Sequence, residues 1–276
     1  MPLEEKAVDL SVVITSYKNP ELLRLCIDSI KKEVQGILYE IIVADSATEE
    51  DTDLMMREEY PEIKFFSHAE NVGFQKLVTM GIQGSLGAFI LFLNGDIIVT
   101  KESVEKLFYY LKEHLGVGMI GPKLLNFNGT FQYSCFRFYR PMTILYRRTF
   151  LGRLPFGKKH LDWFLMKDKH HDKTMEVDWL MGSALMMRRS AIEKVGLMDS
   201  RFFMYMEDVD WCRRFWENDL KIVYYPQSQM YHYHGKGSGK GNILSSLLFN
   251  RLTWIHIVSA VKYFNKYRGK KLPQHA

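Results

Sequence analysis

The sequence contains few cysteines, no long apolar run and no recognisable leader, and each absence excludes a class of protein. Three cysteines without metal-type spacing argue against a disulfide framework and a cysteine-based zinc site. No run of 18 or more apolar residues occurs, so we expect no segment that spans a bilayer. The N-terminus lacks the apolar core of a signal peptide. The sequence therefore predicts a reduced, cytoplasmic, globular protein, whose 47% apolar residues suffice for a packed core.

Acidic residues are missing from the last part of the chain. No Asp or Glu follows Asp219, whereas nine Lys or Arg residues do. A second basic stretch, residues 137–171, carries nine Lys or Arg against two Asp, interleaved with aromatic residues. This composition favours an anionic or amphiphilic partner, although a solvated basic face would give the same pattern. No nucleic-acid-binding motif accompanies it, so we expect no nucleic-acid partner.

The first half of the chain alternates apolar strands with helices. Strands are expected at 10–15, 39–45, 63–67 and 88–93, and helices at 20–32, 49–59 and 71–83. This βαβαβ order predicts an α/β fold. The 88–93 strand is almost wholly apolar and lies between two glycines, so we expect it to be buried on both faces near the middle of the sheet.

Carboxylates follow two of these strands, where ligands of open α/β sheets bind. Asp45 ends the second strand, and Asp96 follows the fourth. The Gly-x-Gly-x-x-Gly loop of dinucleotide enzymes is absent after the first strand, which disfavours a hydride-transfer enzyme and leaves a diphosphate in need of another counter-charge. Asp96 could supply it by holding Mg²⁺ or Mn²⁺. Capping of a turn or helix is the alternative for both aspartates.

The second half places three carboxylates in four residues after an aromatic run: Glu207, Asp208 and Asp210. Acidic residues favour the first turn of a helix, where they face its positive end. One of them in an apolar cleft, with a raised pKa, could instead serve as a general base. Upstream, Gly182 interrupts an apolar segment and indicates that the backbone there passes close to another group.

The late segments are less specific. Short strands are expected at 221–226 and 229–234, and His232 on the second is as compatible with a core position as with a metal ligand. Residues 235–241 indicate a glycine-rich lid or linker. Residues 243–268 look helical, basic and aromatic, as do helices that lie in a lipid headgroup region. A helix packed on its own domain or on a second subunit is the alternative, so a homodimer stays open.

Taken in order, these segments resemble the inverting family 2 glycosyltransferases of the GT-A fold, and among them the rhamnosyltransferase-like branch of bacterial surface-polysaccharide synthesis. The resemblance covers about residues 9–240 and rests on Thr15–Tyr17, Val43–Ser46, Asn71–Phe74, Leu93–Asp96, Asp178–Gly182, Phe202–Asp210, and Pro226 followed by His232. The family's first carboxylate segment reads Asp-x-Asp, or Asn-Pro-Asp in this branch. Here it is Asn94-Gly95-Asp96, which leaves one carboxylate for a metal.

The resemblance implies a role for individual residues. The donor nucleotide would be bound by Thr15, Tyr17, Asp45, Asn71, Gly73 and Asn94. Asp96 and His232 would ligate Mg²⁺ or Mn²⁺ at the diphosphate. Asp208 would remove the proton from an acceptor hydroxyl, and direct displacement would invert the anomeric centre. The acceptor would be positioned by Trp179, Gly182 and Glu207.

The resemblance also implies an organisation and a set of partners. A Rossmann-like nucleotide-sugar-binding half with a mixed central sheet (1–120) would be fused to an acceptor-binding, catalytic half (121–242), followed by a basic helical tail (243–276). The expected donor is a dTDP-sugar, with rhamnose the leading sugar, or a UDP-sugar. The expected acceptor is a glycan or a polyprenyl-diphosphate-linked molecule, met by peripheral contact at the inner face of the cytoplasmic membrane.

Two other functional classes stay open on the sequence. A nucleotidyltransferase or another nucleotide-binding α/β enzyme would share the first half, but it gives Glu207 and Asp208 no clear role. A catalytically silent relative at a membrane surface would bind nucleotide weakly or not at all.

Overall fold

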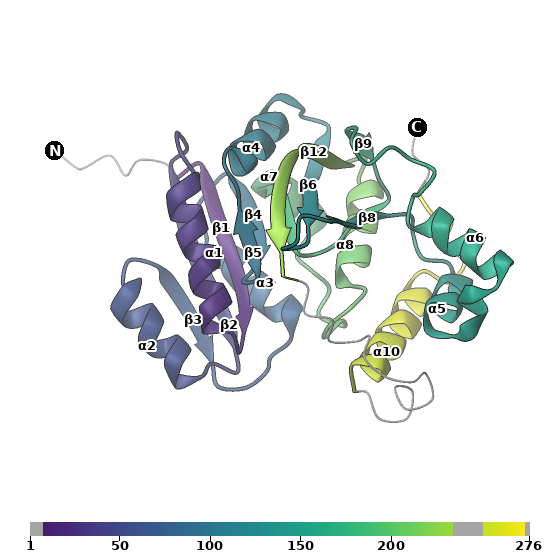
Figure 1. Ribbon diagram of the computed structural model, residues 1–276, viewed down its shortest axis with the longest axis horizontal. Helices are drawn as coiled ribbons and strands as arrows, with labels where there is room; N and C mark the ends of the chain where they lie inside the picture. Colours follow the sequence, from purple (N-terminus) through teal and green to yellow (C-terminus); the bar gives the residue numbers. More distant parts are fainter. Residues whose placement is uncertain (1–7, 234–250, 274–276) are drawn as a thin grey trace.

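A ten-stranded mixed sheet runs through the part of the chain that the computed structural model describes, residues 8–233 and 251–273 (Figure 1). It starts with the parallel strands β1 (Leu10–Tyr17), β2 (Tyr39–Ser46), β3 (Lys64–His68) and β4 (Phe89–Asn94). The helices α1 (Pro20–Glu33), α2 (Glu50–Glu59) and α3 (Phe74–Gln83) connect them. The α/β pattern predicted for the first half is therefore confirmed.

Helix α1 shows why these elements form where the sequence places them. Asn19 caps the helix by accepting a hydrogen bond from the Leu22 N–H (3.1 Å), and Pro20 occupies the first turn, where no N–H is needed. The apolar residues then recur at helical spacing, and Leu23, Cys26, Ile27 and Ile30 are fully buried against the sheet.

Strand β4 is the junction of the sheet. It pairs with β1 in parallel and with β11 (Ala184–Arg188) antiparallel, so the sheet is mixed from this point. Alternate β4 residues enter the apolar cores on the two faces: Ile90 and Phe92 one, Leu91 and Leu93 the other. All four are fully buried, which confirms the predicted central strand.

The chain after β4 completes the sheet and adds helices. The remaining strands of the sheet, the first two of which begin before residue 120, are β5 (Ile97–Val99), β6 (Val117–Leu125), β7 (Phe131–Gln132), β9 (Met175–Glu176) and β12 (Lys221–His232). In addition, β8 (Cys135–Phe136) pairs separately with β10 (Trp179–Leu180). Among the helices of this part are α4 (Ser103–Glu113), α7 (Arg189–Val195) and α8 (Glu207–Trp216). The strand order is β3-β2-β1-β4-β11-β6-β12-β5.

The two short strands expected at 221–226 and 229–234 are in fact one strand, β12. Its register against β6 shifts between Tyr225 and Gln229. Pro226 lies in this interval and has no N–H to donate to a ladder, which accounts for the irregularity without ending the strand. His234 and the glycine-rich segment 235–241 lie outside the described residues.

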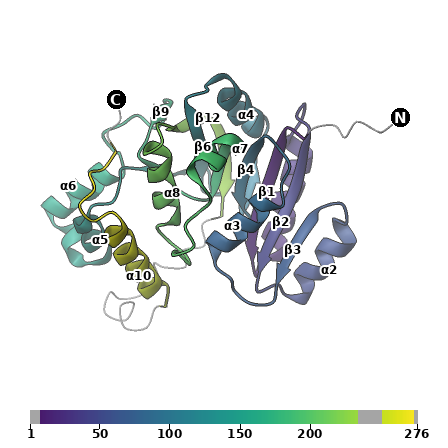
Figure 2. The same cartoon turned by 180° about the vertical axis from the view of Figure 1, so that it is seen from behind.

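The basic stretch 137–171 contributes a helical layer beside the sheet. It contains α5 (Pro141–Arg148), the 3-10 helix η1 (Phe150–Arg153) and α6 (Pro155–Phe164). The late helix α10 (Arg251–Lys266) lies beside α5 in both views (Figures 1 and 2). The Arg148 side chain contacts Nδ1 of His256, which fixes this neighbourhood.

One side of α10 packs on the rest of the protein. Tyr263 and Tyr267 are buried, and the Tyr267 hydroxyl donates to Asp210 in α8 (2.9 Å). Lys266 forms an ion pair with the same carboxylate (2.5 Å). The alternative of a helix packed on its own domain therefore holds for this side. No helix within residues 8–233 or 251–273 combines the length and apolarity of a bilayer span.

Candidate active site

A cleft of about 670 Å³ opens beyond the carboxyl ends of β1 and β4. Five of the six residues predicted to bind a donor nucleotide line it: Thr15, Tyr17, Asn71, Gly73 and Asn94. Asp96, the predicted metal ligand, lines it too. This is the end of the sheet where ligands of α/β folds bind.

The pairing of β1 with β4 explains why residues distant in sequence meet here. Thr15 is the register partner of Asn94, and its hydroxyl donates to the Asn94 side chain (3.4 Å). The Gly95 N–H donates to the Thr15 carbonyl (2.8 Å), which fixes the turn that carries Asp96. Tyr17, at the end of β1, is half exposed to the cleft.

Gly73 joins the two halves of the protein at the cleft wall. Its φ is +83°, and a Cβ at this position would lie 2.6 Å from the Phe203 ring. Asn71 holds the turn by accepting the Gly73 N–H (3.0 Å), and the Phe74 N–H donates to the Phe203 carbonyl (3.2 Å). Glycine is required here for both conformation and close approach.

Asp45 lies outside the lining of the cleft. Its side chain is fully buried at the end of β2, and neither carboxylate oxygen has a partner of normal hydrogen-bond geometry in the described ranges. Burial raises the pKa of Asp45, and the nearby hydroxyls of Thr48 and Ser16 offset part of that rise. Its neighbour Ser46 lines the cleft instead.

Asp96 and His232 come together although 136 positions separate them. The antiparallel pairing of β12 with β5 sets His232 opposite Ile97, and Asp96 Oδ1 lies 3.4 Å from His232 Nε2. The other ring nitrogen of His232 bonds to the Gln132 side-chain oxygen (3.0 Å), which orients the imidazole. Asp96 Oδ1 is buried without a hydrogen-bond partner among the described residues.

This donor set fits a divalent cation. A carboxylate oxygen that lacks a partner and an oriented imidazole nitrogen are both ordinary ligands of Mn²⁺, and the carboxylate suits Mg²⁺. No group of three or more His, Cys, Asp or Glu side chains gathers within residues 8–233 and 251–273. A cation at Asp96 and His232 would therefore need further oxygen ligands from a bound molecule.

Asp208 is held in one orientation by two backbone groups. The Gly182 N–H donates to its Oδ2 (3.1 Å), and the Val209 N–H donates to its Oδ1 (2.8 Å). A Cβ on Gly182 would lie only 3.2 Å from the Asp208 Cβ. The prediction that the backbone passes close to another group at Gly182 is confirmed, and that group is Asp208.

The three acids of α8 have different environments. Asp210 is fully buried and forms ion pairs with Arg214 (2.9 Å) and Lys266 (2.5 Å), so it holds the structure together. Burial, with the Asp208 charge, raises the pKa of Glu207 well above its ordinary range. Burial also raises the pKa of Asp208, although the two backbone N–H donors oppose the rise. A carboxylate with a raised pKa is, in its ionised form, a stronger base than an ordinary carboxylate and so is better able to accept a proton.

Trp179 lies in an aromatic cluster rather than on the cleft surface. Its ring stacks on Phe136 (4.4 Å between centroids) and Tyr139 (5.6 Å), and its indole N–H donates to the Arg137 carbonyl (2.9 Å). It is almost fully buried. Any effect of Trp179 on a bound molecule would pass through this cluster.

Sequence reasoning missed the far wall of the cleft. Phe203, Met204, Leu252 and Ile255 line it, and two of them come from the helix that the sequence placed in a separate tail. Apolar residues of this kind are the ordinary content of a buried helix face, so no local signal connected α10 with the cleft. Only the fold brings them together.

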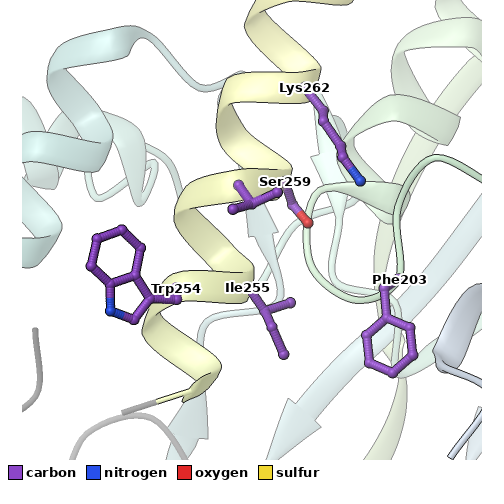
Figure 3. Close-up of a pocket in the computed structure, with 6 residues that line it drawn as sticks. Phe203, Trp254, Ile255, Ser259 and Lys262 are labelled. Atoms are coloured by element: carbon purple, nitrogen blue, oxygen red, sulfur yellow. The ribbon is translucent and has the colours of Figure 1, made fainter. Parts of the chain in front are cut away.

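A smaller apolar groove of about 350 Å³ adjoins this wall, lined by Phe203, Trp254, Ile255, Val258, Ser259 and Lys262. It shares Phe203 and Ile255 with the cleft. In Figure 3, Ser259 and Lys262 point from α10 toward the loop that carries Phe203, and Trp254 projects on the opposite side. The Lys262 ammonium donates to the Arg201 carbonyl (2.8 Å).

Comparison with known families and proteins identifies relatives of known class. The profile of Glycosyl transferase family 2 matches residues 11–196. The chain is 26% identical over 220 residues to a low-salt glycan biosynthesis hexosyltransferase of Haloferax volcanii, covering 78% of this chain and 64% of that protein. It is 25% identical over 233 residues to an N-acetylglucosaminyl-diphospho-decaprenol L-rhamnosyltransferase of Mycobacterium tuberculosis, covering 79% and 74%.

Two solved structures share the fold. One is GalNAc-T7 with UDP, GalNAc and Mn²⁺ (TM-score 0.61, 16% identity), which matches 84% of this chain and 45% of that one. The other is S. aureus TarS (TM-score 0.59, 15% identity), which matches 94% of this chain and 40% of the TarS chain. This chain thus spans less than half of either solved chain.

Proposed function

This chain belongs to glycosyl transferase family 2 and has the GT-A fold, and from that premise we propose that it moves a sugar from a nucleoside diphosphate to a hydroxyl of a glycan or lipid-linked acceptor. Inversion of the anomeric centre is typical of the family. The observation that carries the proposal is the cleft, where five predicted donor residues gather with Asp96, which lies 3.4 Å from His232. The rhamnosyltransferase among the relatives favours dTDP-rhamnose as donor, ahead of a UDP-sugar.

In this proposal the first half of the chain binds the donor and the second half binds the acceptor. The donor half, residues 1–120, supplies most of the polar cleft lining. The acceptor half, 121–242, supplies Asp208, Gly182 and Trp179, which lie outside that lining. The tail, 243–276, adds Leu252 and Ile255 to the far wall. Asp45 would act indirectly on the nucleotide pocket, since it lies outside the lining and its neighbour Ser46 forms part of it.

Asp96 and His232 would hold Mg²⁺ or Mn²⁺, with diphosphate oxygens as further ligands. The chemistry supplied by such a cation is stabilisation of the negative charge on the departing nucleoside diphosphate. Asp96 Oδ1 supports this assignment because it is buried, lies 3.4 Å from His232 Nε2 and accepts no hydrogen bond among the described residues. A buried carboxylate oxygen is costly to leave without a hydrogen bond or a cation.

Asp208 would act as the general base. Its carboxylate takes the proton of the acceptor hydroxyl while that oxygen forms a bond to the anomeric carbon and the bond to the diphosphate breaks on the opposite side. The N–H groups of Gly182 and Val209 hold the carboxylate for this transfer. Glu207, next to Asp208, and the cluster around Trp179 would position the acceptor.

A panel of nucleotide sugars tests the proposal. The purified full chain, with Mn²⁺ or Mg²⁺, should slowly hydrolyse one donor class without an acceptor, and dTDP-rhamnose is the expected one. Release of the nucleoside diphosphate is the measurement, with excess chelator as the control. Turnover of nucleoside triphosphates instead of nucleotide sugars would contradict the proposal and indicate a nucleotidyltransferase. Absence of both binding and turnover over the whole panel would indicate a silent relative.

We also propose peripheral contact with an anionic membrane surface through α10. Trp254, Val258 and Val261 form a stripe at helical spacing, each about half exposed (54%, 48% and 53%), away from the side packed on the protein. No acidic residue follows Asp219, so nothing in α10 repels anionic lipids. Each Lys or Arg near such a leaflet contributes about 1 kcal/mol.

Co-sedimentation with phosphatidylglycerol vesicles tests this contact. The unaltered chain should pellet with vesicles at low salt, less at high salt, and several-fold less after the combined changes Trp254→Gln, Val258→Gln and Val261→Gln. The control changes three exposed leucines of the first half: Leu54, Leu86 and Leu115 to Gln. Equal recovery in the supernatant with and without vesicles would contradict the proposal. A variant that loses only self-association would show that the stripe joins two subunits.

A further inference from the structure

Helix α5 ends in two consecutive arginines, Arg147 and Arg148. Neither forms an ion pair with a carboxylate in the described parts of the chain. Six other arginines do pair with acids: Arg24, Arg57, Arg137, Arg201, Arg213 and Arg214. The neighbouring sequence supplies no acidic residue for them, because no Asp or Glu occurs between Glu113 and Asp162.

The contacts of both arginines are to uncharged groups. Arg147 donates to the Tyr139 hydroxyl and lies over the Phe164 ring (5.4 Å). Arg148 donates to Nδ1 of His256. Burial, together with the charges of Arg148 and Arg147, lowers the pKa of His256 to about 3, so this imidazole is neutral at physiological pH and accepts that hydrogen bond.

The positive charge of α5 has a cost that an anion would offset. Burial lowers the pKa of the Arg148 guanidinium, and the adjacent Arg147 charge lowers it further. The cost falls on Arg148, which is half-buried and has no carboxylate ion-pair partner among the described residues; Arg147 is exposed, and its charge lowers the pKa of Asp208. Guanidinium groups bind phosphate oxygens through two parallel N–H donors, so phosphate is the anion that suits this pair.

The contacts of the two arginines lead to the candidate base from two sides. Tyr139, the partner of Arg147, stacks on Trp179 (5.6 Å), three residues before Gly182, whose N–H holds Asp208. His256, the partner of Arg148, stacks on Tyr205 (4.9 Å), three residues before Asp208. The arginines therefore belong to the surroundings of the base, whereas neither lines the donor cleft.

We propose that Arg147 and Arg148 bind the phosphate of a phosphate-bearing acceptor and so set which acceptor hydroxyl reaches Asp208. This inference rests on the proposed function and narrows its acceptor to a phosphate or diphosphate ester, such as a lipid-linked sugar. The donor diphosphate is assigned to Asp96 and His232, whereas neither arginine belongs to the cleft lining that includes Asp96, so the two anionic groups have separate sites. Both arginines are positioning residues for the acceptor.

Binding of a soluble prenyl diphosphate tests the inference without any turnover. Titration calorimetry of the full chain with farnesyl diphosphate, in chelator so that no cation occupies the donor site, should show binding. The combined variant Arg147→Gln with Arg148→Gln should weaken it at least about tenfold, because charge-assisted hydrogen bonds are lost. The matched control, Lys158→Gln with Lys159→Gln, removes the same charge from exposed positions of α6 and should bind as the unaltered chain does.

Three results would overturn the inference: equal loss in both variants, no loss in either, or farnesol binding as tightly as farnesyl diphosphate. Inorganic pyrophosphate distinguishes the source of the phosphate, because binding as tight as that of the prenyl ester would indicate a site for free anions and not for an acceptor. If loss of the Arg148–His256 contact unfolds the double variant, the single variant Arg147→Gln is titrated instead, and it should also bind farnesyl diphosphate more weakly than the unaltered chain. The calorimetric titration contains no donor. Its result can therefore be interpreted even if no nucleotide sugar in the panel is hydrolysed.

Discussion

Replacing Asp208 with Asn should lower kcat by about 10²–10⁴-fold, the usual contribution of a general base, and leave nucleotide-sugar affinity unchanged. Asparagine keeps the shape of the side chain, and its one oxygen can still accept one of the two backbone N–H groups that Asp208 binds, while the other N–H loses its acceptor. The amide cannot take a proton, so the reaction loses its base, while donor binding, which does not involve this proton, should be kept. Donor affinity is measured by calorimetry and kcat by release of nucleoside diphosphate.

The same variant should change the pH profile. Only the ionised carboxylate accepts a proton, and burial raises the pKa of Asp208 above its ordinary value. The activity of the unaltered enzyme should therefore fall as the pH drops through that raised pKa, on the acidic side of the profile. An asparagine side chain does not titrate, so this limb should be absent from the residual activity of Asp208→Asn.

Asp51→Asn is the matched control, because it makes the same chemical change at an exposed position of α2, remote from the cleft lining. It should leave kcat and the pH profile unchanged. If Asp208→Asn instead abolishes donor binding at constant thermal stability, Asp208 belongs to the donor site and another group removes the proton.

Replacing Asp96 with Ala should lower activity at least about 100-fold, since even residues behind metal ligands typically contribute 10–100-fold. The change removes the carboxylate that lines the cleft and lies beside His232. The fold should persist, because Asp96 Oδ1 has no hydrogen bond to lose among the described residues. Mn²⁺ binding in the presence of the nucleoside diphosphate, followed by electron paramagnetic resonance, should be lost with activity.

His232→Gln provides a graded comparison for the second ligand and should weaken Mn²⁺ binding less than Asp96→Ala does, because the charged ligand remains. Asp51→Ala is the control for loss of a carboxylate. Full activity of the unaltered enzyme in excess chelator, or an Asp96→Ala enzyme of normal activity, would show that donor binding needs no cation at this position.

Local patterns of the sequence predicted most of the donor half. The cap at Asn19, the apolar β4 and the polar turn after it depend on neighbours within a few residues, so the sequence reveals them directly. The approach of Asp96 to His232 depends on the pairing of β12 with β5, which no local pattern encodes. The prediction placed both residues in one site only through the family resemblance.

The acceptor side was less predictable for the same reason. In the sequence the arginines of α5 look like part of a solvated basic stretch, and their significance depends on their contacts with Tyr139 and His256. The sequence likewise could not show that Asp210 is buried between Arg214 and Lys266 while Asp208, two residues earlier, contacts Gly182. The roles assigned to Asp45, Trp179 and Glu207 stay predictions.

The attachment of α10 to α8 bears on how the protein can be shortened for expression. Lys266 and Tyr267 both bind the buried carboxylate of Asp210, two positions after the candidate base. A chain cut before α10 would leave that carboxylate with Arg214 as its remaining ion-pair partner in the described residues. It would also remove the hydrogen bonds from Ser259 and Lys262 to the carbonyls of Met204 and Arg201, shortly before Asp208. Breaking a buried ion pair typically costs about 3–5 kcal/mol, a large share of the stability of a domain. Helix α10 thus stabilises the segment that leads to the candidate base, and a shortened gene that preserves activity should retain the chain through Tyr267.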